Sequence, residues 1–322
     1  MATRPNRNRS SAQHIGSILT ATLGGIAQFI WLTLVGIVSV FMPVQKKNVK
    51  NEIVLVTGAG SGIGAAMAKR FASLGALVVL WDINSETNNR VCEEIKAEGG
   101  RAIAFTCDLS NKEEIYQTAA RVKRDAGNVT VLINNAGIIT GKKIYELSDE
   151  MIEKTFSVNT IAHFWTIKAF VPDMISKNHG HIITIASGAG LFGVPGMVDY
   201  CSSKFGAIGT HSSLTLELEA NGSTGVHTTV VCPFFIDTGM FDGVRSKVPH
   251  LLPILKTDYA VDKIMGAYHS NQSMLLMPRI LYLFLVMQSI FPVKASIAAA
   301  RLFGITTVLD GFKGPRETRK KE

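Results

Sequence analysis

Cysteine is scarce in this 322-residue chain, and its four copies stand far apart. They are Cys92, Cys107, Cys201 and Cys232. Their spacing fits neither a zinc site nor a redox motif, so a reduced compartment is the simplest interpretation. The eight histidines are also scattered, and the pair His179 and His181 is more typical of a strand's flank than of metal ligands. The sequence therefore predicts no metal site.

Charged residues are few as well, at 18% of the sequence, although the formal net charge is +8. Much of that excess lies at the two ends, since residues 1–9 and 313–322 each carry a net charge of +3. Basic ends on a chain that is 47% hydrophobic favour an anionic membrane surface as a partner. No interleaving of basic and aromatic residues supports a nucleic-acid groove, so we expect no nucleic acid as a partner.

One long segment near the N-terminus lacks charge altogether. Between Arg9 and Lys46 there is no Asp, Glu, Lys or Arg, and the densest apolar part runs from Ile15 to Met42. About 20 apolar residues span a bilayer, so residues 1–45 are predicted to form a basic tail and a hydrophobic membrane anchor. A cleaved signal peptide fits less well because no small-residue cleavage site follows. Basic residues flank both ends, so the orientation stays open, as does the choice between a spanning helix and a hairpin in one leaflet.

From residue 52 onward, strand-like and helix-like stretches alternate. The predicted strands are continuous apolar runs, at 52–57, 76–81, 102–106, 129–134, 181–186 and 226–231. Helical patterns separate them, at 63–74, 86–98, 112–125, 149–176 and 200–220. Repeated strand–helix units of this kind predict a parallel sheet covered on both faces. The expected fold class is α/β, a doubly wound parallel sheet over residues 46–277.

The last part of the chain, residues 278–322, turns apolar again before its basic tail. Arg279 and Pro292 bracket 12 mostly apolar residues, too few to span a bilayer. Three interpretations stay open for this extension: a second membrane contact, a cover over a substrate pocket, and ordinary core packing.

A glycine-rich loop lies between the first predicted strand and the first helix. Gly58, Gly62 and Gly64 have the spacing G-x-x-x-G-x-G, where glycine permits a tight turn and the close approach of a pyrophosphate to a helix N-terminus. Asp82 ends the second strand, where a carboxylate can accept hydrogen bonds from ribose hydroxyls and repel a 2′-phosphate. No lysine or arginine in residues 59–61, or directly after Asp82, could receive that phosphate. The pattern predicts a dinucleotide site that prefers NAD(H) to NADP(H); taken alone, it also fits a tight turn and a helix cap.

Three side chains after the fifth predicted strand form a second constellation. Ser187 follows the strand, Tyr200 lies 13 residues later, and Lys204 stands one helical turn after Tyr200. Residues four apart share a helix face, so the Lys204 ammonium can lie beside the phenol. A fixed positive charge lowers the pKa of a phenol, which is about 10 when unperturbed. Tyr200 is therefore a candidate general base for an alcohol, and Ser187 is expected to hydrogen-bond the reacting oxygen.

These motifs, from about Glu52 to Met240, resemble those of the classical short-chain dehydrogenases/reductases, which implies a Rossmann-type sheet. The phrases V-L-W-D-I-N, N-N-A-G-I-I-T-G-K-K and C-P-F-F-I-D-T-G-M-F are similar to the membrane-associated group that contains epidermal retinol dehydrogenase 2 and the 17-beta-hydroxysteroid dehydrogenases 11 and 13. The resemblance implies a catalytic tetrad of Asn159, Ser187, Tyr200 and Lys204. Within it, Asn159 is expected to help hold a water-linked proton relay to Lys204, which also binds the nicotinamide ribose.

The resemblance also implies how cofactor and substrate are held. Asp108 and Leu109 are expected to flank the adenine, and Thr238 to contact the carboxamide or the pyrophosphate. The residues expected to bind NAD are Gly58, Ser61, Gly62, Ile63, Gly64, Asp82, Asp108, Leu109, Asn135, Ala136, Gly137, Tyr200, Lys204, Pro233, Ile236 and Thr238. The residues expected to contact the substrate are Ser187, Phe192, Met197, Phe234 and Met240.

The sequence thus predicts an NAD-dependent oxidoreductase that moves a hydride between the cofactor and a lipophilic alcohol or carbonyl. By resemblance, all-trans-retinol/retinal is the first expected substrate and a 17-beta-hydroxysteroid the alternative. A lipid-droplet docking protein with little catalysis is the alternative of another class. The expected location is the endoplasmic reticulum membrane or a lipid droplet, and a homodimer is an open alternative to a monomer. We expect a cytosolic catalytic domain because four glycosylation sequons would otherwise be accessible, at Asn8, Asn128, Asn221 and Asn271.

Overall fold

The computed structural model describes residues 7–39 and 46–314, and the chain divides into two compact units at the bond between Gln45 and Lys46. Of the predicted basic ends, residues 1–6 and 315–322, which include Arg4 and the basic residues 316–321, lie outside the described residues.

The first unit contains one long helix, α1 (Arg7–Ser39). Its stretch Gly16–Gly36 is 21 residues long and apolar enough to cross a membrane, which makes it a candidate anchor. A signal sequence near the N-terminus has the same length and composition.

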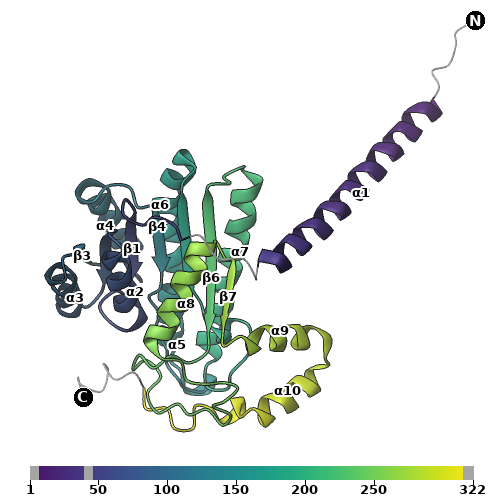
Figure 1. Cartoon of the computed structure of the whole chain (residues 1–322). Coiled ribbons are helices and arrows are strands. Elements are labelled where there is room, and N and C mark those ends of the chain that lie inside the picture. The colour runs from purple at the N-terminus through teal and green to yellow at the C-terminus, as the bar shows by residue number, and fades with distance from the viewer. Residues whose placement is uncertain (1–6, 40–45, 315–322) are drawn as a thin grey trace, which may run out of the picture. The chain divides into compact units, whose positions relative to one another are not determined.

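The second unit is built on a seven-stranded sheet with the order β3-β2-β1-β4-β5-β6-β7, in which every pairing is parallel (Figure 1). The strands are β1 (Ile53–Thr57), β2 (Leu77–Asp82), β3 (Arg101–Thr106), β4 (Val131–Asn134), β5 (Gly180–Ile185), β6 (Val226–Pro233) and β7 (Met274–Met277). The strand order reverses between β1 and β4, and open α/β sheets bind ligands at such a switch point. The predicted doubly wound parallel sheet is confirmed.

Helices cover both faces of the sheet. Val54 and Val56 of β1 pack in a cluster with α2 (Gly62–Ser73), α3 (Ser85–Ala97) and α8 (Thr257–Ser270). Leu55, between them, packs on the opposite face with α4 (Lys112–Asp125), α6 (Ala162–Lys177) and α7 (Val198–Ala220). Successive strand side chains point to opposite faces, so a strand buried on both sides needs the continuous apolar run that the sequence shows.

Two parts of this unit differ from the predicted elements. The single helix expected over 149–176 is divided into α5 (Asp149–Phe156), a π-helical turn (Ser157–Ile161) and α6. The helix α8 and the edge strand β7 were not predicted. β7 has only four residues, too few for a clear strand pattern.

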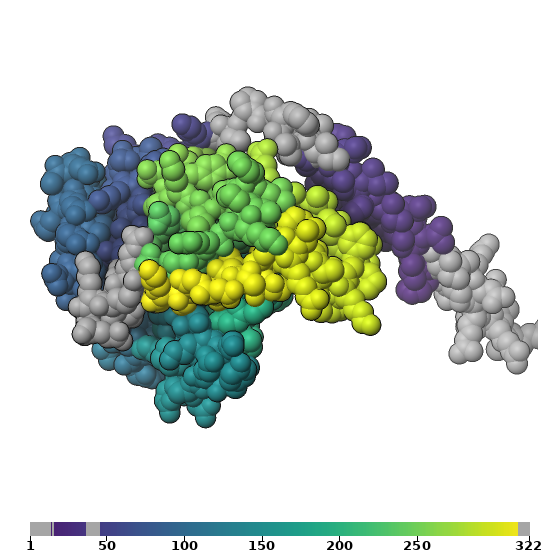
Figure 2. All heavy atoms as spheres, turned by 90° about the horizontal axis from the view of Figure 1, so that it is seen from below, coloured from purple at the N-terminus to yellow at the C-terminus, as the bar shows by residue number. Residues whose placement is uncertain are grey.

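The C-terminal extension forms two more helices, α9 (Ile280–Ile290) and α10 (Val293–Leu302), and then a 3-10 turn at Ile305–Thr307. Figure 2 shows the yellow C-terminal segment crossing the face of this unit that is seen from below. That segment is held in place by a hydrogen bond from the Lys313 backbone N–H to the Asp242 carbonyl oxygen, at 3.0 Å.

Candidate active site

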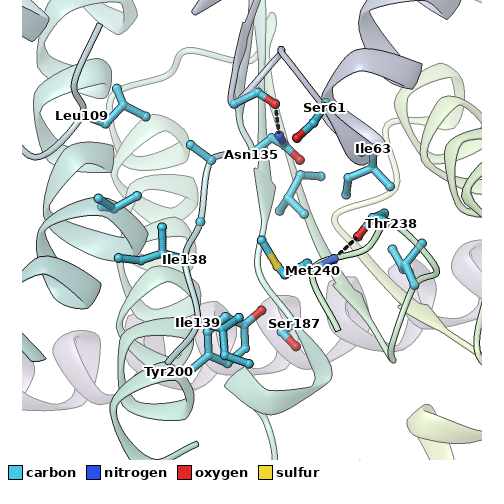
Figure 3. A pocket seen from close by; sticks show the side chains of 18 of the residues that line it. Ser61, Ile63, Leu109, Asn135, Ile138, Ile139, Ser187, Tyr200, Thr238 and Met240 are labelled. Carbon is cyan, nitrogen blue, oxygen red and sulfur yellow. Dashed lines mark hydrogen bonds between the residues drawn. The ribbon is translucent and has the colours of Figure 1, made fainter. Parts of the chain in front are cut away.

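One cavity of about 480 Å³ lies at the carboxyl ends of the strands, in the size range of small-molecule sites. All 16 residues predicted to bind the cofactor line it, as do Ser187, Phe234 and Met240 from the other predicted sets. Figure 3 shows Ser61 and Asn135 toward one end of this pocket and Ser187 with Tyr200 toward the other. The two predicted constellations therefore belong to one site.

Glycines shape the turn between β1 and α2. Gly58 and Gly62 have φ angles of +65° and +56°, in the left-handed region that side chains rarely adopt. A Cβ on Gly64 would stand 2.0 Å from the Gly58 carbonyl oxygen, so only glycine lets the helix come this close. The Asn135 amide secures the turn by donating hydrogen bonds to the carbonyl oxygens of Thr57 (2.8 Å) and Gly58 (3.2 Å). The start of α2, with its unpaired N–H groups, can thus receive an anionic group such as a pyrophosphate.

Asp82 is held at the end of β2 by backbone N–H groups. Its Oδ2 accepts a hydrogen bond from Gly60 N and its Oδ1 accepts one from Asn84 N, both at 2.9 Å. Within the described ranges, no cation lies at ion-pair distance from this carboxylate. The lysines among the lining residues are Lys154 and Lys204, and both have partners elsewhere. Asp82 therefore offers acceptor oxygens, which suit hydroxyl groups better than a phosphate.

A polar network surrounds Asp108, which follows β3. Ser110 donates two hydrogen bonds to its Oδ1, from N at 2.8 Å and from Oγ at 2.7 Å, and the Lys154 ammonium lies 3.1 Å from its Oδ2. Burial alone would raise the pKa of Asp108, but these hydrogen bonds and the ammonium together hold it below its usual value. Sequence reasoning missed Lys154, because it lies on α5, 46 residues further along the chain, in no recognisable motif.

Ser187, Tyr200 and Lys204 meet beyond the end of β5. The Ser187 hydroxyl lies next to the phenol of Tyr200, as Figure 3 shows. The Lys204 Nζ lies 5.8 Å from the centre of the Tyr200 ring and donates a hydrogen bond to the Ile185 carbonyl oxygen at 2.9 Å. Both α7 side chains are almost wholly shielded from solvent. This arrangement brings a hydroxyl, a phenol and an ammonium to one wall of the cavity.

Burial changes the proton affinity of both α7 groups. Loss of solvent raises the pKa of the Tyr200 phenol above its ordinary value, although a hydrogen bond with Ser187 opposes the rise. Burial also lowers the pKa of Lys204, to about 8. The lowered pKa that the sequence predicts for Tyr200 is therefore wrong for the protein without its cofactor, because burial of the phenol is the largest influence on this pKa. The site holds a neutral phenol that is well placed to donate a proton.

Asn159 stands behind this group, buried in the π-helical turn between α5 and α6. Its Oδ1 accepts a hydrogen bond from Ile138 N at 2.8 Å, and its Nδ2 donates to Ile138 O and to Ser203 Oγ, both at 3.0 Å. Asn159 Oδ1 and Lys204 Nζ would each lie 3.3 Å from a Cβ on Gly137, so the two groups flank the same short loop. Asn159 does not itself line the cavity. Its contacts tie the loop after β4 to α7.

The end of the cavity beyond Tyr200 is apolar. Phe234 and Met240 line it together with Ile138, Ile139 and Phe241, and their contact with the substrate stays a prediction. Phe241 stands edge-on to Tyr200, with ring centres 6.1 Å apart. This composition suits a hydrocarbon group next to the reacting oxygen.

Two residues predicted to contact the substrate lie outside the cavity lining. Met197 is 1% exposed and packs in the cluster around Tyr200 and Val244. Phe192 packs against the neighbouring cluster that contains Leu191 and Leu281. A role of Met197 and Phe192 in substrate contact stays a prediction.

A C-terminal segment that no motif marks packs on the cluster around Tyr200. Val308 is buried in the cluster that contains Tyr200, and Leu309 and Phe312 pack against it. The ring of Phe312 fills the space over Gly141, where a Cβ would stand 2.0 Å from it. Only apolar composition hinted at this role, and composition does not tell which surface an apolar segment will cover.

The chain is similar to known proteins over most of its length. The family model described as short chain dehydrogenase matches residues 52–249. Epidermal retinol dehydrogenase 2 of Homo sapiens is 49% identical over 272 residues, which cover 84% of this chain and 88% of that protein.

Solved structures share the fold and contain either form of the nicotinamide cofactor. A short-chain dehydrogenase/reductase from Burkholderia phymatum in complex with NAD is 25% identical with a TM-score of 0.68, covering 76% of this chain and 94% of that one. A metagenomic short-chain oxidoreductase in complex with NADP is 32% identical with a TM-score of 0.59, covering 70% of this chain and 96% of that one. The chain belongs to the short-chain dehydrogenase/reductase family and is an oxidoreductase that acts on alcohols with a nicotinamide cofactor.

Proposed function

We propose that this protein oxidises a lipophilic alcohol with NAD⁺, with all-trans-retinol as the first candidate, and reduces the aldehyde in the reverse direction. One observation carries the proposal. A single cavity has a glycine turn and an acceptor carboxylate, Asp82, at one end, and Ser187, Tyr200 and Lys204 beside apolar side chains at the other.

Each residue of the predicted tetrad has its own role in the proposed reaction. A bound nicotinamide supplies the hydride acceptor. The Ser187 hydroxyl orients the substrate oxygen by hydrogen bonding, and the Tyr200 oxygen takes the proton of the alcohol. Lys204 favours the phenolate by its charge, and Asn159 fixes the loop beside it and, by family analogy, helps the proton leave. In the reduction the neutral phenol, which burial favours, donates its proton to the carbonyl oxygen.

The preference for NAD(H) rests on Asp82. Its two oxygens are oriented by backbone N–H groups, so they can accept hydrogen bonds from the ribose hydroxyls. A 2′-phosphate at the same place would meet a carboxylate held close by, and like charges at such distances repel. Solved structures of similar proteins contain NAD or NADP, so the Asp82 carboxylate is the feature by which this protein is proposed to select NAD(H) over NADP(H).

The preference for a hydrocarbon substrate rests on the apolar end. The side chains of Ile138, Ile139, Phe234, Met240 and Phe241 present no charged group there. Burying apolar surface stabilises a ligand by roughly 25 cal/mol per Å², so a long hydrocarbon gains more than a short soluble alcohol. A steroid carries a second oxygen that would need its own partner. The 49% identity to a retinol dehydrogenase supports the same order.

The proposal also covers the cellular location, the domain division and the oligomeric state of the enzyme. We place α1, within a segment of residues 1–45, in the endoplasmic reticulum membrane or on lipid droplets, with a cytosolic catalytic domain at 46–277 and an extension at 278–322. Removing residues 1–45 should release the protein from carbonate-washed membranes. A homodimer is supported by exposed aromatic side chains on two neighbouring helices, Phe164 on α6 and Phe205 on α7.

The deciding experiment measures kcat/KM of the detergent-solubilised, full-length protein for retinol and estradiol, each with NAD⁺ and with NADP⁺. We expect the highest value for retinol with NAD⁺. A tenfold preference for estradiol would reverse the substrate order, and a preference for short alcohols would defeat the lipophilic proposal. Absence of turnover with every pair, matched by the Tyr200→Phe variant, would favour a docking protein without catalysis.

A further inference from the structure

The hairpin formed by α9 and α10, residues 280–302, exposes an unusual amount of apolar surface. Helix α9 has no charged residue in its 11 positions. Six aliphatic side chains of the hairpin are 44–75% exposed: Leu283, Val286, Ile290, Val293, Ile297 and Leu302. Single exposed apolar residues are ordinary, but a set on two successive helices marks an interaction site.

The charged residues in the hairpin's own stretch of the chain all have one sign. No Asp or Glu occurs between Asp262 and Asp310, whereas Arg279, Lys294 and Arg301 lie on or beside the hairpin. In the part of the chain that the structure describes, none of these three cations has an ion-pair partner. Aliphatic side chains with cations and no anions are typical of helices that lie in the interface of an anionic bilayer.

The hairpin is firmly attached to the sheet, so its exposed side has a fixed direction. Leu281 is 3% exposed and packs in the cluster below α9. The Tyr282 hydroxyl donates a hydrogen bond to Met274 O at 2.9 Å and accepts one from Leu276 N at 3.2 Å, which joins α9 to β7. Phe303, just after α10, packs on a ring of α9 with centres 4.9 Å apart. The two helices therefore behave as one layer at the β7 edge.

This layer also adjoins the apolar end of the cavity. Phe234 lines the cavity and packs both on the cluster around Tyr200 and on the cluster that holds α9. Leu281 Cδ1 would lie 3.6 Å from a Cβ on Gly188, the residue after Ser187. One layer of side chains thus separates the hairpin from the reacting groups.

We propose that the α9–α10 hairpin docks on an anionic lipid bilayer, with its aliphatic side chains at the acyl boundary and its cations among the headgroups. Docking in this way places the apolar end of the cavity next to the phase in which a lipophilic substrate dissolves; that consequence, unlike the docking, rests on the proposed function. A second copy of the chain is a poorer occupant, because two hairpins face to face would bring their like-charged Lys294 and Arg301 side chains together.

A fluorescence experiment on the full-length chain tests the docking without any turnover. The native cysteines are all buried, so an environment-sensitive thiol dye will label Ile297→Cys selectively. The matched control is Leu74→Cys, since the two native side chains are 44% and 43% exposed and Leu74 leads into β2, near the opposite edge of the sheet. Each labelled protein is reconstituted in vesicles of phosphatidylcholine with phosphatidylserine that contain a doxyl-labelled lipid.

We expect blue-shifted, quenched emission at position 297 and neither change at position 74. The Lys294→Glu/Arg301→Glu variant should lose most of the quenching, as should vesicles of phosphatidylcholine alone. Arg90→Glu/Lys96→Glu on α3, with the same change in net charge, should keep it. Unquenched emission at 297, or equal quenching at 297 and 74, would overturn the proposal. A disulfide between two copies at position 297 in place of quenching would assign the surface to a dimer instead.

Discussion

The turn between β1 and α2 allows a sharp test of the cofactor site through the substitution Gly64→Ala. The added Cβ would stand 2.0 Å from Gly58 O and 2.6 Å from Asn135 Nδ2, whereas ordinary contact begins at 3.4 Å. The nearest atom belongs to the backbone, so the turn or the helix must shift by roughly 1.4 Å to restore contact distance. Either shift moves the N–H groups that are proposed to receive the pyrophosphate.

The expected magnitudes follow from this overlap. Forcing a methyl group into a packed site costs about 1–3 kcal/mol, which lowers Tm by roughly 2–4 °C for each kcal/mol in a domain of this size. The matched control is Gly266→Ala on α8, where a Cβ meets nothing within 4 Å and removing a helical glycine stabilises by about 0.5–1 kcal/mol. NADH affinity should fall at least tenfold in the first variant, which corresponds to about 1.4 kcal/mol, and stay unchanged in the second.

Thermal melting and titration of NADH fluorescence, both on detergent-solubilised full-length protein, measure the two effects separately. A Gly64→Ala variant that melts below the wild type and binds NADH weakly agrees with the geometry. If it binds NADH with the wild-type Kd, the turn is not the pyrophosphate site, whatever its Tm.

Three further outcomes are expected. Tyr200→Phe should lower kcat by roughly 100- to 10,000-fold, as loss of a general acid–base does, with NADH affinity nearly unchanged; a rate close to wild type would exclude Tyr200 as the proton acceptor. Asp82→Ala with Ile83→Arg should move the kcat/KM ratio toward NADP⁺, and a wild-type preference for NADP⁺ would contradict the role of Asp82. Burial, and then the Lys204 ammonium, lower the pKa of His163 from 6.5 to about 3, so the unfolded chain binds the proton first. Stability should therefore be full above about pH 6.5 and fall below it by about 1.4 kcal/mol per pH unit for this group; denaturant melts of wild type and His163→Gln measure it, and equal pH slopes would refute the assignment.

Much of the site could be predicted because its motifs are local in sequence. The strand before Gly58, the strand that ends at Asp82 and the helix that carries Tyr200 and Lys204 are each defined by short patterns, and a parallel sheet brings their ends to one edge. What escaped prediction depends on packing between distant segments. Lys154 binds Asp108 although the two residues are 46 positions apart in the sequence. Periodicity shows that the segment around Lys154 is helical, but it does not show which residue the lysine ammonium will contact.

The pKa of Tyr200 also could not be predicted from local sequence. Spacing on α7 correctly indicates that an ammonium lies near the phenol, and from that fact alone the expected shift is downward. Its sign also depends on how completely the phenol is buried, which is set by side chains from other parts of the chain, such as Phe241 and Val308. Desolvation then dominates, and the pKa rises.

The two ends of the cavity also differ in how they are built. The cofactor end is made mostly of backbone, with glycine turns and fixed N–H groups, where a single Cβ on Gly64 would collide with the chain. The proposed substrate end is made of side chains from separate segments, including Ile139 after β4 and Phe241 after β6, and Phe312 near the C-terminus packs behind them. A change at Phe241 alters the shape of that end without touching the glycine turn or the carboxylate of Asp82. Under the proposed function, substrate choice can therefore change by substitution in these loops while the glycine turn and Asp82 stay the same, so specificity is expected to depend on residues outside the motifs.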